Sequence, residues 1–77
     1  MPFPPHSINR EDFAQFTLAQ IMAGDTNAGK RLNAVWEVST DTHYFELQRR
    51  IDGEYVTEKK FAALDEAIAA YNDFKGL

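Results

Sequence analysis

Residues 24–31, GDTNAGKR, have the spacing that most directly suggests chemistry. They match G-x-x-x-x-G-K, the skeleton of a P-loop, in which backbone N–H groups and a lysine hold nucleotide phosphates. A P-loop has Ser or Thr after the lysine to bind magnesium, whereas this chain has Arg31. We also expect the segment to follow a helix and open a strand, which places the wrong end of a helix dipole near a phosphate. We therefore interpret it as a turn and expect no nucleotide cofactor.

Metal-binding and acid–base residues are sparse. His6 and His43 are the only histidines, and neither an H-x3-H nor an HExxH spacing is present. The chain has no cysteine, which excludes a disulfide scaffold, a thiolate metal site and a cysteine nucleophile. Asp41 could orient His43 for proton transfer, but Asp41 is better explained as a hairpin-turn residue. We expect no metal site, no cofactor and no catalytic residue.

Other enzyme classes also lack support. There is no G-x-S-x-G nucleophile elbow. Glu37, Glu46 and Glu58 could line one sheet face, where cross-strand pairs with basic residues serve solubility and register. A two-carboxylate hydrolase needs a cleft, and a chain this short has little room for one. An enzyme or ligand-binding alternative needs a pocket between the first helix and the sheet, which no residue pattern demands. We therefore expect a protein that is not an enzyme.

Length and charge narrow the class of protein. The chain has 77 residues, enough for one small domain. Its net charge is −4 and its pI is about 4.9, which counts against a protein whose binding depends on contacts with phosphate groups, as in nucleic acids. No apolar run approaches the roughly 20 residues of a membrane span, and the start of the chain does not resemble a secretory signal. We expect a cytoplasmic protein with no membrane partner.

The first part of the chain is expected to be a head followed by a helix. Three prolines make residues 1–8 an extended head, and residues 9–77 form a single α+β domain. Asn9 is a good N-cap and Gly24 a good C-terminal stop, so we predict a helix over residues 10–23. The predicted apolar face of this helix contains Phe13, Ala14, Leu18, Ile21 and Met22.

The remainder is expected to be a sheet and a second helix. Alternating residues predict strands over residues 32–40, 43–51 and 54–60, joined by turns at Asp41-Thr42 and Asp52-Gly53. A helix over residues 63–74 follows. The predicted fold is helix, three-stranded antiparallel meander, helix (αβββα). The apolar face of the last helix contains Leu64, Ala67, Ile68, Tyr71 and Phe74.

Strand alternation also predicts a surface for recognition. A sheet of this kind buries one face and leaves the other open unless the first helix covers it. Phe16 points away from the apolar side of the first predicted helix: it is either covered by the head or a neighbouring strand, or exposed as an anchor for a partner. The candidate interaction surface contains Phe16, Tyr44, Glu46, Gln48, Arg50 and Lys60.

The segment FAALDEAIAAYN matches the pattern F-x4-E-A-x2-A-Y-[DN], from Phe61 to Asn72. It resembles the end of AP2-type domains and of the arm-binding domains of phage integrases, and the resemblance extends loosely over residues 34–72. It implies a three-stranded sheet followed by one helix. It also implies that the open sheet face reads DNA, with Arg50, Tyr44 and Lys59 or Lys60 in the matching positions.

Two functions follow from these observations. The acidic charge and the candidate exposed aromatic residues favour a small regulatory protein that acts by binding another protein. Compact acidic chains of this size are common among phage and mobile-element accessory proteins, some of which inhibit host enzymes. The alternative is a sheet-face DNA-binding domain. A three-stranded sheet leaves free edges, so we expect a monomer or a homodimer that pairs its edges.

Overall fold

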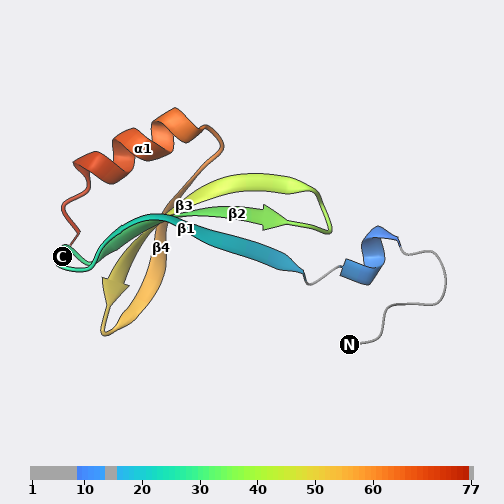
Figure 1. Cartoon of the computed structure of the whole chain (residues 1–77), viewed down its shortest axis with the longest axis horizontal. Helices are drawn as coiled ribbons and strands as arrows, with labels where there is room; N and C mark the ends of the chain where they lie inside the picture. Colours follow the sequence, from blue (N-terminus) through green and yellow to red (C-terminus); the bar gives the residue numbers. More distant parts are fainter. Residues whose placement is uncertain (1–8, 14–15, 77) are drawn as a thin grey trace.

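The computed structural model describes residues 9–13 and 16–76. In this part of the chain, a four-stranded antiparallel sheet lies between a short 3-10 helix and a C-terminal α-helix (Figure 1). The elements are η1 (Arg10–Phe13), β1 (Thr17–Asp25), β2 (Lys30–Glu37), β3 (Thr42–Ile51), β4 (Glu54–Phe61) and α1 (Leu64–Asp73). The strand order β1-β2-β3-β4 follows the sequence. The α+β class is confirmed, but the predicted αβββα order is only partly matched.

The prediction of a helix over residues 10–23 is wrong. Only η1 is helical there, and the chain then continues as β1. Backbone pairing with β2 explains the difference, because β1 is bonded to β2 along its length and the Val38 N–H donates to the Phe16 carbonyl over 3.1 Å. Aromatic and β-branched residues such as Phe16, Thr17 and Ile21 also favour a strand. Gly24 therefore lies within a strand and does not end a helix.

β1 contains a β-bulge. The register shifts between Ile21 and Ala23, so Met22 is an extra residue in the strand. This insertion breaks the alternation of period two by which a strand is recognised in a sequence. The predicted roles of Ala14 and of the head over residues 1–8 lie outside the described residues.

The other predicted elements are close to those observed. β2 begins and ends earlier than expected, and the turn after it contains Asp41 with a φ of 53°. The Asp52-Gly53 hairpin is confirmed, with φ values of 52° and 84° that fit a type I′ turn. The helix predicted over residues 63–74 is α1, which is not long and apolar enough to cross a membrane; nor is any other helix among the described residues.

The core forms where α1 packs on β2, β3 and β4. Ala67 is completely buried, and its small side chain lets the helix lie close to the sheet. Burying one large aliphatic or aromatic side chain contributes about 1.5–3 kcal/mol. The buried cluster is Leu32, Leu47, Phe61 and Ala67, with Phe45, Ala70, Tyr71 and Phe74 packed against it. Leu64 and Ile68, predicted to belong to the same helix face, remain 42% exposed.

Lys30 joins the end of α1 to β2. Its Nζ donates to the carbonyl oxygens of Tyr71 (2.6 Å) and Phe74 (2.9 Å) and lies 4.3 Å from the centre of the Tyr71 ring. The last turn of α1 contains no basic residue, so Lys30 supplies the positive charge that the carboxyl end of a helix favours. The lysine of the P-loop-like segment thus has a structural role in capping α1.

Replacing Lys30 by Met tests this cap. Lys30→Met keeps the aliphatic stem but leaves two helix-end carbonyls without their charged donor. We expect the free energy of unfolding to fall by about 2 kcal/mol. Urea denaturation followed by Trp36 fluorescence measures it. The control is Lys75→Met, at an exposed residue beyond the same helix end, which we expect to change stability little. Equal effects of the two substitutions would contradict the cap.

Gly76 provides a second test of how the C-terminal end is held. It has a φ of 75°, and a Cβ there would overlap the backbone of Ala28 in the β1–β2 turn. Gly53 also has a positive φ but open space around it. We expect Gly53→Ala to cost about 1–2 kcal/mol from backbone strain alone and Gly76→Ala to cost more. Similar losses in thermal or urea denaturation would show that the contact with Ala28 is not tight.

Candidate protein-binding surface

Most of the predicted interaction residues share the face of the sheet away from α1. Leu47 of β3 points into the core under α1, so its neighbours Glu46 and Gln48 point to the opposite side, together with Tyr44 and Arg50. Lys60 of β4 is paired with Glu46 and joins them. We call this side the open face. Its residues on β2, β3 and β4 are Arg31, Asn33, Val35, Glu37, Tyr44, Glu46, Gln48, Arg50, Tyr55, Thr57 and Lys60, and the paired β1 residues Thr17, Ala19 and Ile21 lie on the same side. Phe16 lies before β1 and does not join them.

A chain of hydrogen bonds crosses the centre of the open face. Gln48 Oε1 accepts from Arg31 Nε (2.6 Å) and from Asn33 Nδ2 (3.0 Å). Gln48 Nε2 donates to Thr57 Oγ1 (3.3 Å), which donates to Glu46 Oε2 (2.6 Å). Asn33 and Gln48 are buried. These side chains are therefore held by one another across three strands, and a ligand on this face would have to compete with bonds already made.

The aromatic residues of the open face hold its cations. Lys60 Nζ lies 4.9 Å from the centre of the Tyr44 ring, and the Arg31 guanidinium lies 4.0 Å from that of Tyr55. The Tyr44 hydroxyl donates to Glu37 Oε1 over 3.0 Å. Burial, followed by the hydrogen bond and the charge of Glu37, raises the pKa of Tyr44 to about 12. Tyr44 thus stays neutral and is anchored by a carboxylate.

Arg50 lies at the border of the open face. Its Nη2 donates to the carbonyl oxygen of Thr26 in the β1–β2 turn over 2.9 Å, and its backbone N–H donates to Gly29 over 2.8 Å. Arg50 therefore fastens β3 to that turn. Asp25 Oδ1 completes the turn by accepting from the N–H groups of Asn27 and Ala28, both at 3.0 Å.

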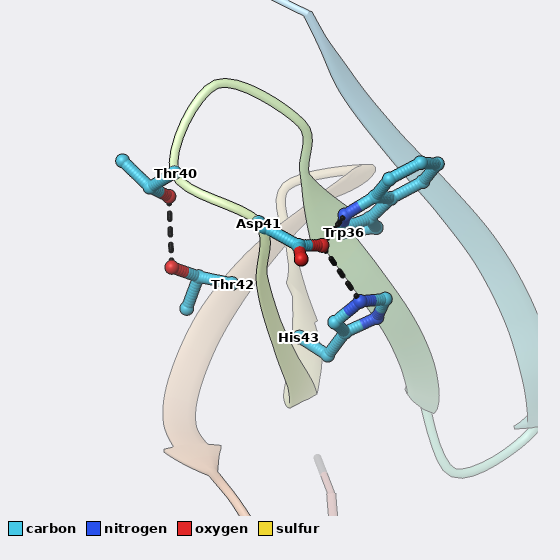
Figure 2. Close-up of polar contacts among 5 residues, drawn as sticks. All are labelled: Trp36, Thr40, Asp41, Thr42 and His43. Atoms are coloured by element: carbon cyan, nitrogen blue, oxygen red, sulfur yellow. Dashed lines mark hydrogen bonds and ion pairs between the residues drawn. The ribbon is translucent and has the colours of Figure 1, made fainter. Parts of the chain in front are cut away.

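Asp41 lies in the predicted turn and also contacts His43 and Trp36. Its N–H donates to the Val38 carbonyl in the turn, and its Oδ1 accepts from Trp36 Nε1 (2.9 Å) and lies 3.3 Å from His43 Nε2 (Figure 2). The Trp36 and His43 rings stack with their centres 5.5 Å apart. The side chains of Asp41 and His43 are more than half exposed, so this cluster stands at the surface. Trp36 was missed as its third member, because only the register places it opposite His43.

A metal site does not form around these groups. Among the described residues, no three His, Cys, Asp or Glu side chains gather closely enough to hold an ion. The depression beside Trp36 is shallow, with a volume of about 200 Å³. Its lining includes Leu18 and Gln20 of β1, which leads to the edge of the sheet.

The edge strand β1 and Phe16 just before it carry four large exposed apolar residues. Phe16 is 51% exposed, Leu18 47%, Ile21 58% and Met22 44%. Within the described residues β1 pairs only with β2, so its other side is an open edge of the sheet. Sequence reasoning included Phe16 in the candidate interaction surface but missed the other three residues, because it assigned Leu18, Ile21 and Met22 to the apolar face of a helix. The signal that favours a strand is the aromatic and β-branched run Phe16-Thr17 with Ile21.

The two edges of the sheet differ in charge. β4 carries Glu54, Glu58, Lys59 and Lys60, the kind of charged residues that discourage pairing with another chain. β1 has no charged residue from Thr17 to Gly24, and Asp25 is its last residue. Of the two edge strands in the described part of the chain, β1 is the one that combines a long uncharged edge with several exposed apolar residues. The β-bulge at Met22 shortens the regular part of this edge to the residues before it.

Comparison with known proteins does not assign this chain to a family. No family model matches the sequence, and neither the curated proteins nor the solved structures include a significant match. The resemblance to AP2-type and integrase arm-binding domains therefore stays a prediction.

The pKa of Tyr44 gives a test of the open face. Because the folded state raises this pKa from 10.0 to about 12, the unfolded chain loses its phenol proton first as pH rises. We expect the contribution of Tyr44 to stability to be intact below pH 10 and to fall between pH 10 and about 12. Tyr44→Phe should flatten this part of the curve of unfolding free energy against pH.

Glu37→Gln is the matched variant. It keeps an acceptor for the Tyr44 hydroxyl but removes the charge, so it should flatten the curve only in part, because burial is the larger cause of the shift. Parallel curves for the wild-type chain and Tyr44→Phe would contradict the anchored position of Tyr44.

Proposed function

We propose that this chain is a small non-enzymatic regulatory protein that acts by binding another polypeptide, and that β1 is the element that recognises it. The observation that carries the proposal is the combination, on one strand, of exposed apolar side chains and an open backbone edge. An extended segment can add to such an edge as a further strand: main-chain hydrogen bonds supply affinity, and alternate side chains supply specificity.

The free energy available at β1 supports binding. Each Å² of apolar surface removed from water contributes roughly 25 cal/mol. Leu18, Ile21 and Met22 of β1 each leave close to half of their surface exposed, with Leu18 on the side of the sheet that carries α1 and Ile21 on the opposite, open face. An exposed apolar edge without charges also pairs readily with unintended chains. A dedicated partner gives this surface a function and protects it.

The alternative is DNA binding by the open face, where Tyr44, Arg50 and Lys60 lie together, but the contacts of this face favour it less. Glu37 and Glu46 lie among the cations of that face. Arg31 and Lys60 are held over tyrosine rings, and Arg50 bonds to the β1–β2 turn. DNA binding requires cations that are free to replace counterions along the phosphate backbone. The net charge of −4 adds a long-range repulsion.

A comparison of two isoleucine variants tests the proposal. The wild-type chain, Ile21→Lys and Ile51→Lys are each immobilised and exposed to a lysate of cells that express the chain, and a protein that is retained is purified and titrated. Ile21 and Ile51 are both large exposed apolar residues, 58% and 41% exposed, but only Ile21 lies on β1. We expect Ile21→Lys to weaken binding at least tenfold, about 1.4 kcal/mol, and Ile51→Lys to leave it unchanged.

Two results would contradict the proposal. One is equal binding of the partner by all three proteins, with circular dichroism showing that each is folded. The other is tight, salt-sensitive binding of a mixed-sequence DNA duplex that Lys60→Gln weakens and Ile21→Lys leaves intact.

A further inference from the structure

We infer that the polypeptide that pairs with β1 is β1 of a second copy of this chain, so that two sheets join into one continuous antiparallel sheet. This inference rests on the proposed use of β1 as a binding edge and names its partner. We infer that the two strands pair in a register centred on Ala19. Three features support this register: the direction of the backbone groups, the side chains and the position of the bulge.

The backbone of β1 shows which groups are available at the edge. The Val38 N–H donates to the Phe16 carbonyl, so Phe16 and Val38 form a hydrogen-bonded pair of the β1–β2 ladder. Backbone groups alternate in direction along an antiparallel strand. Those of Leu18 and Gln20 therefore point toward β2, and those of Thr17, Ala19 and Ile21 point away from the sheet.

These three outward-pointing residues are spaced symmetrically about Ala19. In an antiparallel pair with a two-fold axis at Ala19, this residue lies opposite Ala19 of the partner subunit. Thr17 then lies opposite Ile21 of the partner subunit, and Ile21 opposite Thr17 of the partner subunit. All three are hydrogen-bonded pairs, which together exchange about six N–H···O bonds. One strand thus supplies both halves of a closed, two-fold interface.

The side chains fit the same register. A methyl group at the two-fold axis lets the strands approach closely, and Ile21 can pack on the methyl group of Thr17 of the partner subunit. Phe16 falls beside Met22 of the partner subunit, an aromatic–thioether contact that covers two exposed residues. No like charges meet, because the segment from Thr17 to Gly24 is uncharged.

The bulge favours this register over one centred on Ile21. A pairing centred on Ile21 places Ala19 opposite Ala23 and takes the interface through Met22, where the regular alternation breaks. The register centred on Ala19 ends its bonded pairs at Ile21, before the bulge. In this dimer both β1 edges are paired with each other, and the unpaired edges are the charged β4 strands. Assembly therefore ends at the dimer.

Opposed residues of paired strands share a face of the sheet. The two copies of α1 therefore lie on one side of the joined sheet, and the two open faces lie side by side on the other. Each subunit carries a net charge of −4. The subunits repel one another at long range, so the dimer should become tighter as salt screens this repulsion, the opposite of the salt dependence of DNA binding.

Sedimentation equilibrium from micromolar to millimolar concentration tests dimer formation. We expect the wild-type chain and Ile51→Lys to dimerise, more tightly at moderate than at low salt. Ala19→Pro is expected to be monomeric over the same range. Proline removes an outward-pointing N–H that β2 does not use, and an edge strand accepts it there. Circular dichroism of dilute samples verifies that this variant is folded.

Disulfide formation tests the register. The chain contains no cysteine, so a single introduced cysteine can bond only to its copy in another chain. Hydrogen-bonded antiparallel pairs have Cα atoms about 5.5 Å apart, within the range of a disulfide. We expect Ala19→Cys to form a disulfide-linked dimer on mild oxidation. The matched Ile21→Cys should not, because its counterpart lies further along the strand.

The outcomes separate this inference from the proposed function. A wild-type chain that is monomeric throughout, or a crosslink that forms in Ile21→Cys and not in Ala19→Cys, overturns the inference as stated. If the chain is monomeric, and a purified partner binds Ile51→Lys but not Ile21→Lys, the proposed function stands and the partner is a different protein. If the chain is monomeric and that partner binds all variants equally, both are overturned.

Discussion

The packing of α1 on β2, β3 and β4 is the interaction on which the rest of the structure depends. This ten-residue helix is the apolar cover that the described residues provide for the sheet, and Ala67 is completely buried where it meets the strands. Lys30 fixes its carboxyl end through the Tyr71 and Phe74 carbonyls. The helix packs on β2, β3 and β4, and β1 keeps its apolar residues at the surface, with Leu18 on the helix side and Ile21 on the open face.

The two remaining surfaces of the sheet meet this constraint differently. Over β2, β3 and β4 the open face is covered by its own polar side chains, because Gln48 bonds to Arg31, Asn33 and Thr57. Its cations lie against tyrosine rings or donate to Gln48 and the Thr26 carbonyl, and its carboxylates accept from the hydroxyl groups of Tyr44 and Thr57. β1 has no comparable arrangement, because its side chains between Thr17 and Gly24 are uncharged. A second chain is the natural way to remove this apolar strip from water, which is why we place recognition there.

The predictions from sequence were accurate where local signals decide the structure. Asp52-Gly53 specifies its hairpin, and period-two alternation places Tyr44, Glu46 and Gln48 on one face. The first predicted helix was wrong because Leu18, Ile21 and Met22 have a helical spacing although Leu18 and Ile21 lie on opposite faces of a strand, and because pairing with β2 is a long-range interaction. The bond from Arg31 to Gln48 and the stacking of Trp36 on His43 depend on strand register, which alternation alone does not specify. Phe16 was placed in the same predicted surface as Tyr44 because both are aromatic, but it lies just before β1 and not among the open-face residues of β3.

The measurement that tests this account most directly is amide hydrogen exchange along β1, followed by NMR in dilute solution. Leu18 and Gln20 should be protected by their bonds to β2, whereas Thr17, Ala19 and Ile21 should exchange quickly and gain protection only as the protein concentration rises. This alternation at low concentration, and its loss at high concentration, would establish both the open edge and its pairing with another copy. Protection of all five amides at every concentration, as in a helix, would contradict the account.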